Sequence, residues 1–453
     1  MSVRSILSLG LMAVPAVMGT PVANNGNTKS VGNGSDKTVT VTAAPVTVTV
    51  TAQASCSAST SHSTSTSFST STTHTSSASG SPSTGPSSAS ACSTVSGLPS
   101  TTVYPTTSGT GMAQAAEKAG RYFGTAADIP GTGEAQDPYY IAEFNNNADF
   151  DQATPANIMK WMYVEPEQNV FNFTGGDYFI AQAKGKKIRC HNLNWYNQNP
   201  YWLTNPTTPW NKTGLLAVLE NHIDKTMQHF GNNCYHWDVV NEAFNDDGTW
   251  REDIWYNVTG TDYIYTAFRA ANAAKAKYGI NSLLFYNDYN IEYNGAKAQA
   301  AQALIRNLTA AGINVDGAGL QSHFIVGQTP GLSSQMQNMQ NFANIKNAQG
   351  HNISVAVTEL DVRTTTPATA ANQQQQVTDY YNTVNACANV ARCVGVTVWD
   401  FDDTYSWVPS TFAGQGYADL FFQPCGANTP LVKKAAIDGV IDGFLNKTLG
   451  TYA

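Results

Sequence analysis

The chain has 453 residues and a formal net charge of −8, and 12% of its residues are charged while 11% are aromatic. Length alone would allow about two or three domains. The negative net charge argues against nucleic acid or an anionic membrane as a partner. Many aromatic residues with little charge suit a secreted protein that binds an uncharged, ring-shaped ligand, although core packing would use aromatic residues too.

Residues 1–19 have the pattern of a secretory signal peptide. Arg4 precedes an apolar run over residues 6–18, small residues follow, and we expect cleavage between residues 19 and 23. A membrane span is the alternative, but the run is too short to cross a bilayer. We therefore expect a secreted, extracellular protein with no membrane association.

Secretion places the seven cysteines in an oxidising environment. Cys387 and Cys393 are close in sequence and are predicted to close a small loop. Cys190 and Cys234 could pair between neighbouring strands, although the sequence does not fix the connectivity. We expect a monomer, and the odd count then leaves at least one thiol unpaired. No cysteine spacing is typical of zinc, and we expect neither a metal nor a cofactor. Asn-x-Ser/Thr sequons agree with secretion and occur at Asn33, Asn172, Asn211, Asn257, Asn307, Asn352 and Asn446.

Residues 20–110 are dominated by Ser and Thr, with Pro and Gly interspersed. Such a composition cannot bury enough apolar surface to offset the entropy lost on ordering, so we predict a disordered, O-glycosylated segment. A small cellulose-binding module is the alternative. The only cysteines there are Cys56 and Cys92, and no tryptophan precedes Trp161, which argues against such a module.

From residue 111 to residue 453, short β-rich runs alternate with helical patterns, as in repeated βα units. Eight strands with helices between them predict one α/β domain of the (β/α)8 TIM-barrel type. A doubly wound open sheet is the structural alternative, but no Gly-rich phosphate loop follows these strands. The predicted strands lie near residues 121–124, 152–159, 187–193, 235–241, 283–287, 319–322, 354–360 and 394–401, and clear helical patterns cover residues 261–278, 295–311 and 368–388.

Two of the predicted strands end in a glutamate. Residues 237–240 form a short β-branched and aromatic run that leads to Asn241 and Glu242, and residues 354–358 lead to Glu359. In a parallel α/β barrel the C-terminal strand ends carry the catalytic face, so the barrel would bring these two carboxyl groups together. Each glutamate alone could instead cap a strand or pair with a lysine.

Other predicted strand ends carry amides, indoles, histidines and one lysine. Amides and lysine bond sugar hydroxyls and tryptophan stacks on a pyranose, so this set around two carboxylates indicates glycoside hydrolysis. Taken alone, a strand-end tryptophan is more often part of the core and a histidine is more often structural. The side chains concerned are Asn157, Lys160, His191, Trp195, Gln198, Asn241, Tyr289, Gln321, His323, Asp361, Trp399 and Trp407.

Seven motifs in a fixed order span the region after residue 110. They are Thr-Pro-x-Asn-x-Met-Lys-Trp at 154–161, His-x-Leu-x-Trp at 191–195, Trp-Asp-Val-Val-Asn-Glu-Ala at 237–243, Tyr-Asn-Asp-Tyr-Asn at 286–290, Gln-Ser-His-Phe at 321–324, Thr-Glu-Leu-Asp-Val at 358–362 and Val-Trp…Tyr-Ser-Trp at 398–407. With these motifs the region resembles glycoside hydrolase family 10, the retaining endo-β-1,4-xylanase family, in its fungal form. The resemblance implies xylan, a polysaccharide, as the substrate.

The resemblance also implies a role for each matching residue. Glu242 would be the proton donor and later the base, with its pKa raised by a neighbouring negative charge and partial burial. Glu359 would be the nucleophile, kept ionised by His323, which Asp361 would orient. Asn241 would bond the sugar 2-hydroxyl.

The remaining matches are implied to bind substrate. Gln321 would stabilise the intermediate and Tyr289 would pack beside the site. The −1 and −2 sugar positions would be shaped by Asn157, Lys160, His191, Gln198, Trp399 and Trp407, with Trp195 in the wall.

The chain departs from the family pattern beside these sugar positions. Ala156 stands where many members have a glutamate that bonds the sugar at −2, Tyr196 stands where a histidine is usual, and residues 400–404 make an acidic loop. Two alternatives to a xylanase therefore stay open. One is a tomatinase-type glycosidase that removes the tetrasaccharide from the saponin α-tomatine. The other is a non-catalytic carbohydrate-binding barrel, against which the complete catalytic set argues.

Overall fold

The computed structural model describes residues 97–99, 101–106 and 109–450. The predicted signal peptide and most of the Ser/Thr-rich segment lie outside these residues. So do Cys56 and Cys92, and the expectation of an unpaired thiol depends on them. In the described part of the chain, no helix is long and apolar enough to cross a membrane.

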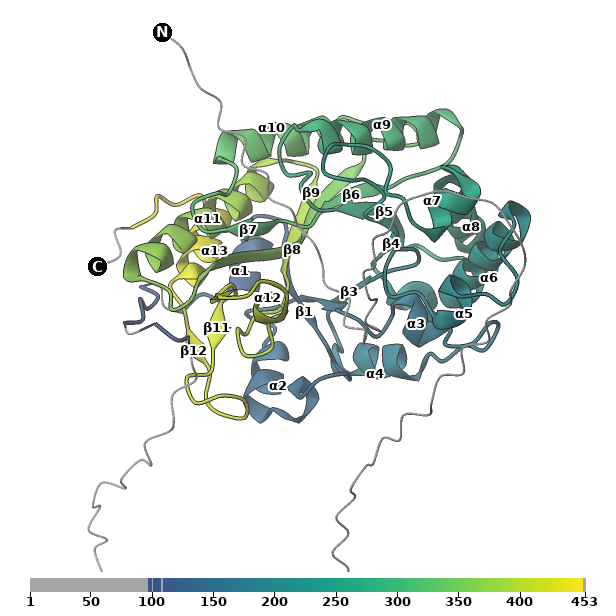
Figure 1. Cartoon of the computed structure of the whole chain (residues 1–453). Coiled ribbons are helices and arrows are strands. Elements are labelled where there is room, and N and C mark those ends of the chain that lie inside the picture. The colour runs from purple at the N-terminus through teal and green to yellow at the C-terminus, as the bar shows by residue number, and fades with distance from the viewer. Residues whose placement is uncertain (1–96, 100, 107–108, 451–453) are drawn as a thin grey trace, which may run out of the picture. The chain divides into compact units, whose positions relative to one another are not determined.

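Eight parallel strands close into a barrel in the order β1, β2, β3, β4, β5, β6, β8 and β9, and β9 pairs again with β1 (Figure 1). This closure confirms the predicted (β/α)8 barrel, and the open-sheet alternative is wrong. The barrel strands are β1 (Tyr122–Ala127), β2 (Gln152–Pro155), β3 (Lys187–Cys190), β4 (His236–Asn241), β5 (Leu283–Asp288), β6 (Gly317–Leu320), β8 (Ser354–Thr365) and β9 (Cys393–Val398).

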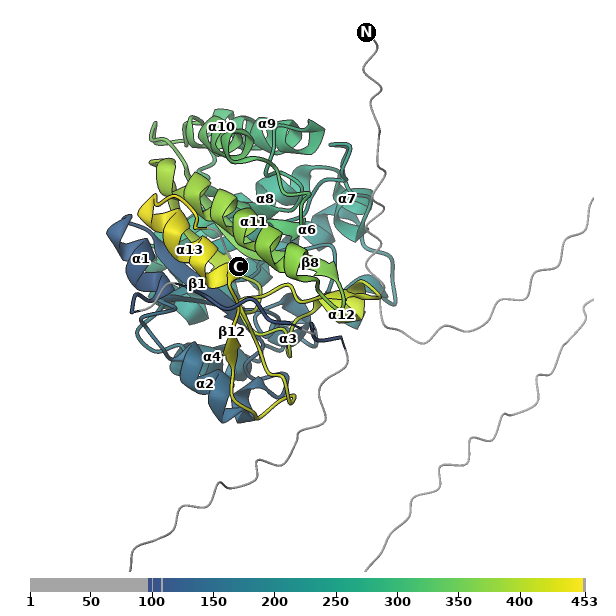
Figure 2. The same cartoon turned by 90° about the vertical axis from the view of Figure 1, so that its left-hand side faces the viewer.

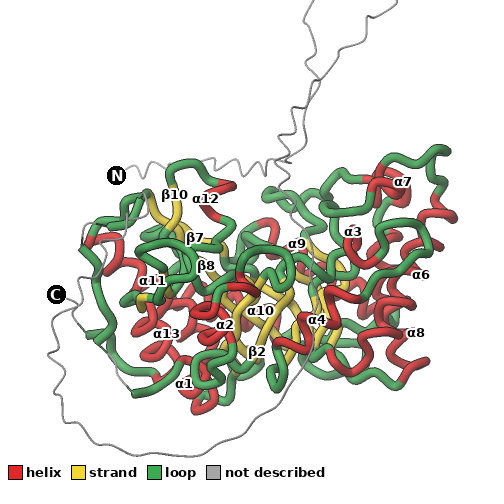
Figure 3. Tube along the Cα trace, turned by 90° about the horizontal axis from the view of Figure 1, so that it is seen from below, coloured by secondary structure: helices red, strands yellow, loops and turns green. Residues whose placement is uncertain are grey.

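Helices surround the strands on the outside, as the view coloured by secondary structure shows (Figure 3). The main helices are α1 (Met112–Lys118), α2 (Pro138–Phe144), α4 (Thr174–Gln182), α6 (Lys212–Phe230), α8 (Asp262–Tyr278), α9 (Ala296–Ala310), α10 (Leu332–Ala343), α11 (Ala370–Asn389) and α13 (Ala436–Leu445). Shorter helices and turns are α3 (Trp161–Val164), α5 (Tyr201–Thr204), α7 (Ile254–Thr259), α12 (Val408–Thr411), η1 (Glu134–Gln136) and η2 (Gly231–Asn233). The last two long helices, α11 and α13, run side by side (Figure 2). Their close approach requires Gly439, because a Cβ there would meet the carbonyl oxygen of Val377 at 2.3 Å.

Several strand boundaries differ from the predicted ones, and three of the differences have clear physical reasons. β2 ends at Pro155 rather than near residue 159, because proline cannot donate to the next ladder bond. β6 begins two residues before the predicted strand, at Gly317, and glycine gives no strand signal. β8 continues to Thr365, because its second half pairs with two short strands, β7 (His323–Ile325) and β10 (Gln415–Gly416). The two remaining strands, β11 (Phe421–Phe422) and β12 (Val432–Lys433), form a separate small sheet.

The described residues before α1 pack against the barrel. Val103 is buried, its backbone N–H donates to Gln373 Oε1 at 2.8 Å, and its carbonyl accepts from Ala435 at 3.1 Å. The Thr106 hydroxyl donates to Asp438 Oδ2 at 2.8 Å. This stretch, at the end of the predicted Ser/Thr-rich segment, therefore contacts α11 and the start of α13.

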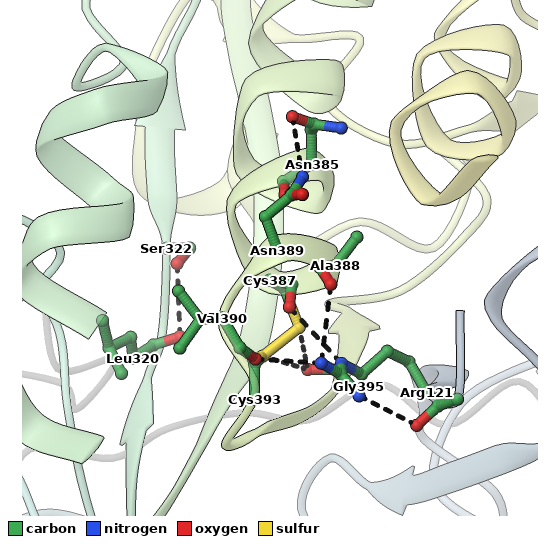
Figure 4. The surroundings of a disulfide bond; sticks show 11 residues. Arg121, Leu320, Ser322, Asn385, Cys387, Ala388, Asn389, Val390, Cys393 and Gly395 are labelled. Atoms are coloured by element: carbon green, nitrogen blue, oxygen red, sulfur yellow. Dashed lines mark hydrogen bonds between the residues drawn. A yellow bond between two sulfur atoms is a disulfide. The ribbon is translucent and has the colours of Figure 1, made fainter. Parts of the chain in front are cut away.

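Both predicted disulfides are formed. Cys190 at the end of β3 is bonded to Cys234 just before β4, and Cys387 in α11 is bonded to Cys393 at the start of β9. Beside the second bond, the Arg121 guanidinium donates to the carbonyl of Val390 at 2.9 Å, so it satisfies a backbone acceptor beyond the C-terminus of α11 (Figure 4).

Candidate active site

The predicted site residues follow the C-terminal ends of the barrel strands. Asn157 and Lys160 follow β2, His191, Trp195 and Gln198 follow β3, and Glu242 follows β4. Tyr289 follows β5 and Gln321 follows β6, while Glu359 and Asp361 lie within the long β8 and Trp399 and Trp407 follow β9. His323 begins β7, which pairs with β8 at Asp361.

Glu359 is surrounded by hydrogen-bond donors. The guanidinium of Arg189 and the amide of Asn287 both donate to Oε1, at 2.8 and 2.9 Å. The imidazole of His323 lies 3.3 Å from Oε2 and bonds Asp361 through its other nitrogen at 2.8 Å. Two of these three groups are cationic, since Asp361 raises the pKa of His323 to about 10 against the opposing effect of burial.

The charge balance keeps Glu359 ionised. Burial alone would raise its pKa, but the charge of Arg189, followed by the His323 hydrogen bond, outweighs burial and sets the pKa far below its ordinary range. Arg189 is fully buried and is fixed from the other side by Asp238, whose Oδ2 accepts from Nε at 2.8 Å. The arginine therefore has only one arrangement available to it.

Glu242 lies in the opposite kind of environment. Its Oε1 accepts hydrogen bonds from two neutral amides, Gln321 at 2.9 Å and Asn241 at 3.3 Å. Burial and then the negative charge of Asp288 raise its pKa above the ordinary value. Lys297 lies 2.9 Å from Asp288 and partly offsets that charge. Glu242 therefore retains its proton at a pH where Glu359 has lost its own.

The backbone at Glu242 is strained. Its φ of +56° is a left-handed conformation that is costly for a residue with a side chain. Two hydrogen bonds hold it there, because its N–H donates to Asn287 O at 2.9 Å and its carbonyl accepts from Arg251 Nε at 2.9 Å. This conformation fixes the direction in which the carboxyl group leaves the end of β4.

A bridge of amides links the two carboxyl groups. Asn287 donates from Nδ2 to Glu359 and also to Asn241 Oδ1, at 2.9 and 2.7 Å. Asn241 in turn donates to Glu242. Only Gly319 fits beneath this bridge, because a Cβ there would lie 2.3 Å from Asn287 Oδ1. The amides of Asn287 and Asn241 therefore connect the two carboxyl groups through hydrogen bonds.

A polar wall adjoins the carboxyl pair. The ammonium group of Lys160 donates to Gln198 Oε1 at 2.7 Å and to Asn157 Oδ1 at 2.9 Å. Burial lowers the pKa of Lys160 to about 8, while the charges of Glu359 and Asp128 oppose that shift. The wall therefore presents fixed donors and acceptors of the kind that bind hydroxyl groups.

Aromatic rings complete the cleft. Trp407 donates from Nε1 to Asp361 at 2.8 Å and meets His323 edge to face, with ring centroids 4.9 Å apart. Trp399 meets His191 in the same way at 5.4 Å, and Lys160 lies 4.7 Å from the Trp195 ring centroid.

Near Glu242, Tyr289 accepts a hydrogen bond from Arg251 at 2.8 Å, and the guanidinium of Arg251 lies 4.2 Å from the Tyr196 ring centroid. Each carboxyl group therefore has aromatic rings in its surroundings.

Among the residues that surround the carboxyl groups, the sequence-based selection missed Arg189 and Asp238. It noted Asn287 and Asp288 at a strand end but gave them no role. Arg189 and Asp238 are charged residues inside short, buried strands. Because charged side chains are seldom fully buried without a partner, their positions in the strands could have indicated a functional role. Asn287 and Asp288 lie in a matched motif at the end of β5, but their partners come from other strands.

No group of three or more His, Cys, Asp or Glu side chains in the described part of the chain could hold a metal ion.

Comparison with known proteins agrees with this geometry. Residues 111–442 match glycosyl hydrolase family 10. Endo-1,4-beta-xylanase D of Talaromyces funiculosus is 47% identical over 325 residues, which cover 71% of this chain and 74% of that protein. Endo-1,4-beta-xylanase A of Phanerodontia chrysosporium is 48% identical over 328 residues, covering 72% and 74%.

Solved structures show the same relationship. The structure of a family 10 xylanase from Bispora sp. MEY-1 with xylobiose is 55% identical, has a TM-score of 0.71, and covers 74% of this chain and 99% of that one. The endo-1,4-beta-xylanase XylE of Penicillium canescens is 49% identical with a TM-score of 0.70, covering 75% and 98%. A two-carboxylate site at the C-terminal end of a (β/α)8 barrel, with these relatives, identifies the chain as a member of glycosyl hydrolase family 10.

Proposed function

We propose that the protein is a secreted, retaining endo-1,4-β-xylanase that cleaves the xylan backbone by double displacement. The observation that carries the proposal is a pair of glutamates with opposite environments: Glu359 contacts Arg189 and His323, which lower its pKa, whereas Glu242 contacts neutral amides and lies near Asp288, which raises its pKa together with burial. Retaining glycosidases need one carboxylate as the nucleophile and one carboxylic acid as the proton donor, about 5–5.5 Å apart.

In the first step, a Glu359 carboxylate oxygen attacks the anomeric carbon. The bond from that carbon to the glycosidic oxygen breaks, and the Glu242 proton passes to the leaving oxygen. The result is a covalent glycosyl ester on Glu359 and an ionised Glu242. Burial of both groups strengthens these electrostatic effects.

In the second step, Glu242 accepts a proton from water as the water oxygen attacks the same carbon. The ester bond breaks, Glu359 leaves as a carboxylate, and the anomeric configuration is retained. We assign Asn241 to the sugar 2-hydroxyl and Gln321 to the intermediate, since both side chains meet Glu242. His323 keeps the leaving carboxylate charged, and Tyr289 packs beside the site.

We assign the −1 and −2 sugars to the polar wall and the rings beside it. The hydrogen-bonded set of Asn157, Lys160 and Gln198 supplies partners for hydroxyl groups. The rings of Trp399 and Trp407 supply stacking surfaces, His191 lies beside them, and Trp195 forms part of the wall.

We further propose the chain organisation of a secreted enzyme: a signal peptide over residues 1–19, a Ser/Thr-rich segment over residues 20–110 and a catalytic barrel over residues 111–453, acting as a monomer. The apolar run near the N-terminus and the sequons support secretion.

Product analysis on purified protein tests the function. We expect xylobiose and xylotriose from beechwood-type xylan and no tomatidine from α-tomatine. Release of tomatidine with little action on xylan would overturn the proposal in favour of a saponin glycosidase. The relatives named above carry xylanase names, and no observation on the structure favours the saponin.

A further inference from the structure

The turn between β6 and β7 carries two of the side chains that contact the carboxyl pair. Gln321 donates from Nε2 to Glu242 Oε1 at 2.9 Å. The imidazole of His323 lies 3.3 Å from Glu359 Oε2. Only Ser322 separates these two residues. The backbone at Ser322 therefore sets how a contact to the proposed acid and a contact to the proposed nucleophile are placed relative to each other.

This backbone departs from strand geometry at Ser322. Its φ is +67°, a left-handed conformation that is unfavourable for a residue with a side chain. On its N-terminal side the ladder bonds end at Gln321, whose N–H donates to the Asp288 carbonyl at 3.0 Å and whose carbonyl accepts from the Glu359 N–H at 2.9 Å. On its C-terminal side β7 begins at His323. A contact from outside these strands is therefore needed to hold Ser322 in this conformation.

Glu292, in the loop after β5, supplies such a contact. Its Oε1 accepts from the Ser322 backbone N–H at 2.7 Å. Both residues are buried, and an unpaired backbone N–H in a buried position is costly. The Ser322 hydroxyl bonds elsewhere, since it donates to the Leu320 carbonyl at 3.2 Å. The carboxyl group of Glu292 therefore fixes the main chain of the turn and leaves its side chains to other partners.

The loop that carries Glu292 is itself held by the outer helices. The neighbouring Ile291 is buried, and its carbonyl accepts from Asn338 Nδ2 in α10 at 2.6 Å. Asn338 Oδ1 in turn accepts from Gln302 Nε2 in α9 at 3.4 Å. Hydrogen bonds thus connect two outer helices to this loop, and the loop to the turn that touches both carboxyl groups.

The hydrogen bond from Ser322 does not require a charged Glu292. Burial raises the pKa of Glu292 to about 7, against the opposing effects of that hydrogen bond and of the charges of Lys297 and His323. In either protonation state the oxygen that accepts from Ser322 keeps a lone pair. A neutral side chain of the same shape can therefore make the same bond.

We propose, on the basis of the function proposed above, that Glu292 is a positioning residue of the reaction. It holds the turn at Ser322 so that one neighbour of Ser322 meets the proton donor while the other meets the nucleophile. Its contribution is made through the turn rather than on the reacting atoms, and it depends on the hydrogen bond rather than on the charge.

Two conservative variants separate the hydrogen bond from the charge. Glu292→Asp keeps the carboxyl group but is one methylene shorter, so it should lose the bond to the Ser322 N–H. Glu292→Gln removes the charge and keeps an oxygen that can accept. In Glu292→Asp we expect kcat on xylan to fall by about 10- to 100-fold with KM within about threefold of wild type, because small displacements of groups that act in the transition state are costly in rate. Glu292→Gln should lose no more than about threefold in kcat.

The pH profile supplies a readout that a loss of stability alone would not move. Burial and then Asp288 raise the pKa of Glu242, whereas the hydrogen bond from Gln321 lowers it. If that bond is weakened in Glu292→Asp, the pKa of Glu242 should rise. Since the acid acts only when protonated, the alkaline limb of kcat/KM should move to higher pH, and it should stay in place in Glu292→Gln. The other charged neighbours of Glu242, which both variants retain, are Arg251 and Lys297.

Asp149→Ala is the control for the loss of a buried carboxyl group. Asp149 accepts from the Met112 backbone N–H at 3.0 Å, and it lies just before β2, at the opposite end of the barrel from the carboxyl pair. This variant should unfold at a lower temperature, while its kcat and KM stay within about twofold of wild type and its alkaline limb does not move.

The outcomes separate this inference from the proposed function. If the wild-type protein does not hydrolyse xylan, both fall. If it does, a folded Glu292→Asp variant with an unchanged kcat and alkaline limb overturns only the positioning inference. A loss in Glu292→Gln as large as that in Glu292→Asp would also overturn it, because the charge would then matter. Where Glu292→Asp does not fold, Glu292→Gln decides: retained activity supports the inference, and a loss of more than about tenfold refutes it.

Discussion

The two glutamates proposed as catalytic lie directly after β4 (Glu242) and within β8 (Glu359), and the charges around them differ in sign. Glu359 faces Arg189 and His323, whereas Glu242 faces neutral amides and the carboxylate of Asp288. Both are buried, so burial raises both pKa values and does not distinguish them. The neighbouring charges do, and they suit Glu359 to the role of nucleophile and Glu242 to the role of acid that we propose.

The largest expected effect comes from removing the nucleophile. Glu359→Gln keeps the shape of the side chain but cannot form the glycosyl ester, so kcat should fall by about 10⁴-fold or more. Steady-state rates on xylan measure this, with Glu252→Gln, an exposed residue beside the cleft, as the matched control. A Glu359→Gln enzyme that turns over xylan at the wild-type rate would refute the assignment.

Removing the acid should separate substrates by leaving group. In Glu242→Ala we expect activity on xylan to fall by about 10²- to 10⁴-fold, because the leaving oxygen is no longer protonated. A 4-nitrophenyl glycoside needs little such help, so its first step should be much less affected. Burst kinetics on the two substrates compare these steps, and equal losses on both would argue against Glu242 as the acid.

Arg189 tests the cationic side of the comparison. Arg189→Lys retains the charge but cannot bond Asp238, Glu359 and the Thr358 carbonyl together as arginine does. We expect a loss of about 10²-fold at the pH optimum. Because the nucleophile acts only when ionised and its pKa would rise, the acidic limb of kcat/KM should move to higher pH.

Arg392→Lys is the control for that substitution, since Arg392 bonds Ile353 and Ser354 at the opposite end of the barrel. An acidic limb that stays in place in a folded Arg189→Lys variant would mean that His323 alone keeps Glu359 ionised.

Asp288 tests the anionic side and should have the smallest effect. Asp288→Asn removes the charge that raises the pKa of Glu242 and leaves Lys297 with Asp246 as its ion-pair partner, so the pKa of Glu242 should fall. Since the acid acts only when protonated, the alkaline limb of the pH profile should move to lower pH. Activity at the pH optimum should change by less than about tenfold. Asp246→Asn, which removes an exposed partner of Lys297, should leave the limb unchanged, and an upward shift in Asp288→Asn would contradict the account.

Much of this site could be predicted from the sequence because barrel geometry gathers the strand ends. The motifs that contain Glu242 and Glu359 could be recognised because each lies within one short stretch of sequence. Arg189 was missed because its partners, Asp238 and Glu359, come from two other strands, and only closure of the barrel brings them together. The early start of β6 at Gly317 was missed because glycine has no side chain to show a strand pattern.

The surroundings of Ala156 show the same limit. Ala156 was recognised as a departure from the family pattern, but the sequence could not show which side chains lie beside it. They include Asp128, which directly follows β1, and Glu134, which begins η1, and the Asp128 backbone N–H donates to Glu134 Oε2.

The most direct test of the central claim is to trap the glycosyl-enzyme. A 2-deoxy-2-fluoro xylobioside with a good leaving group should glycosylate the protein and release the intermediate only slowly, and peptide mass spectrometry would locate the added sugar. We expect one disaccharide per chain, attached to Glu359, and no label in Glu359→Gln. A label on Glu242, or turnover with no covalent species, would contradict the assignment of the two carboxyl groups.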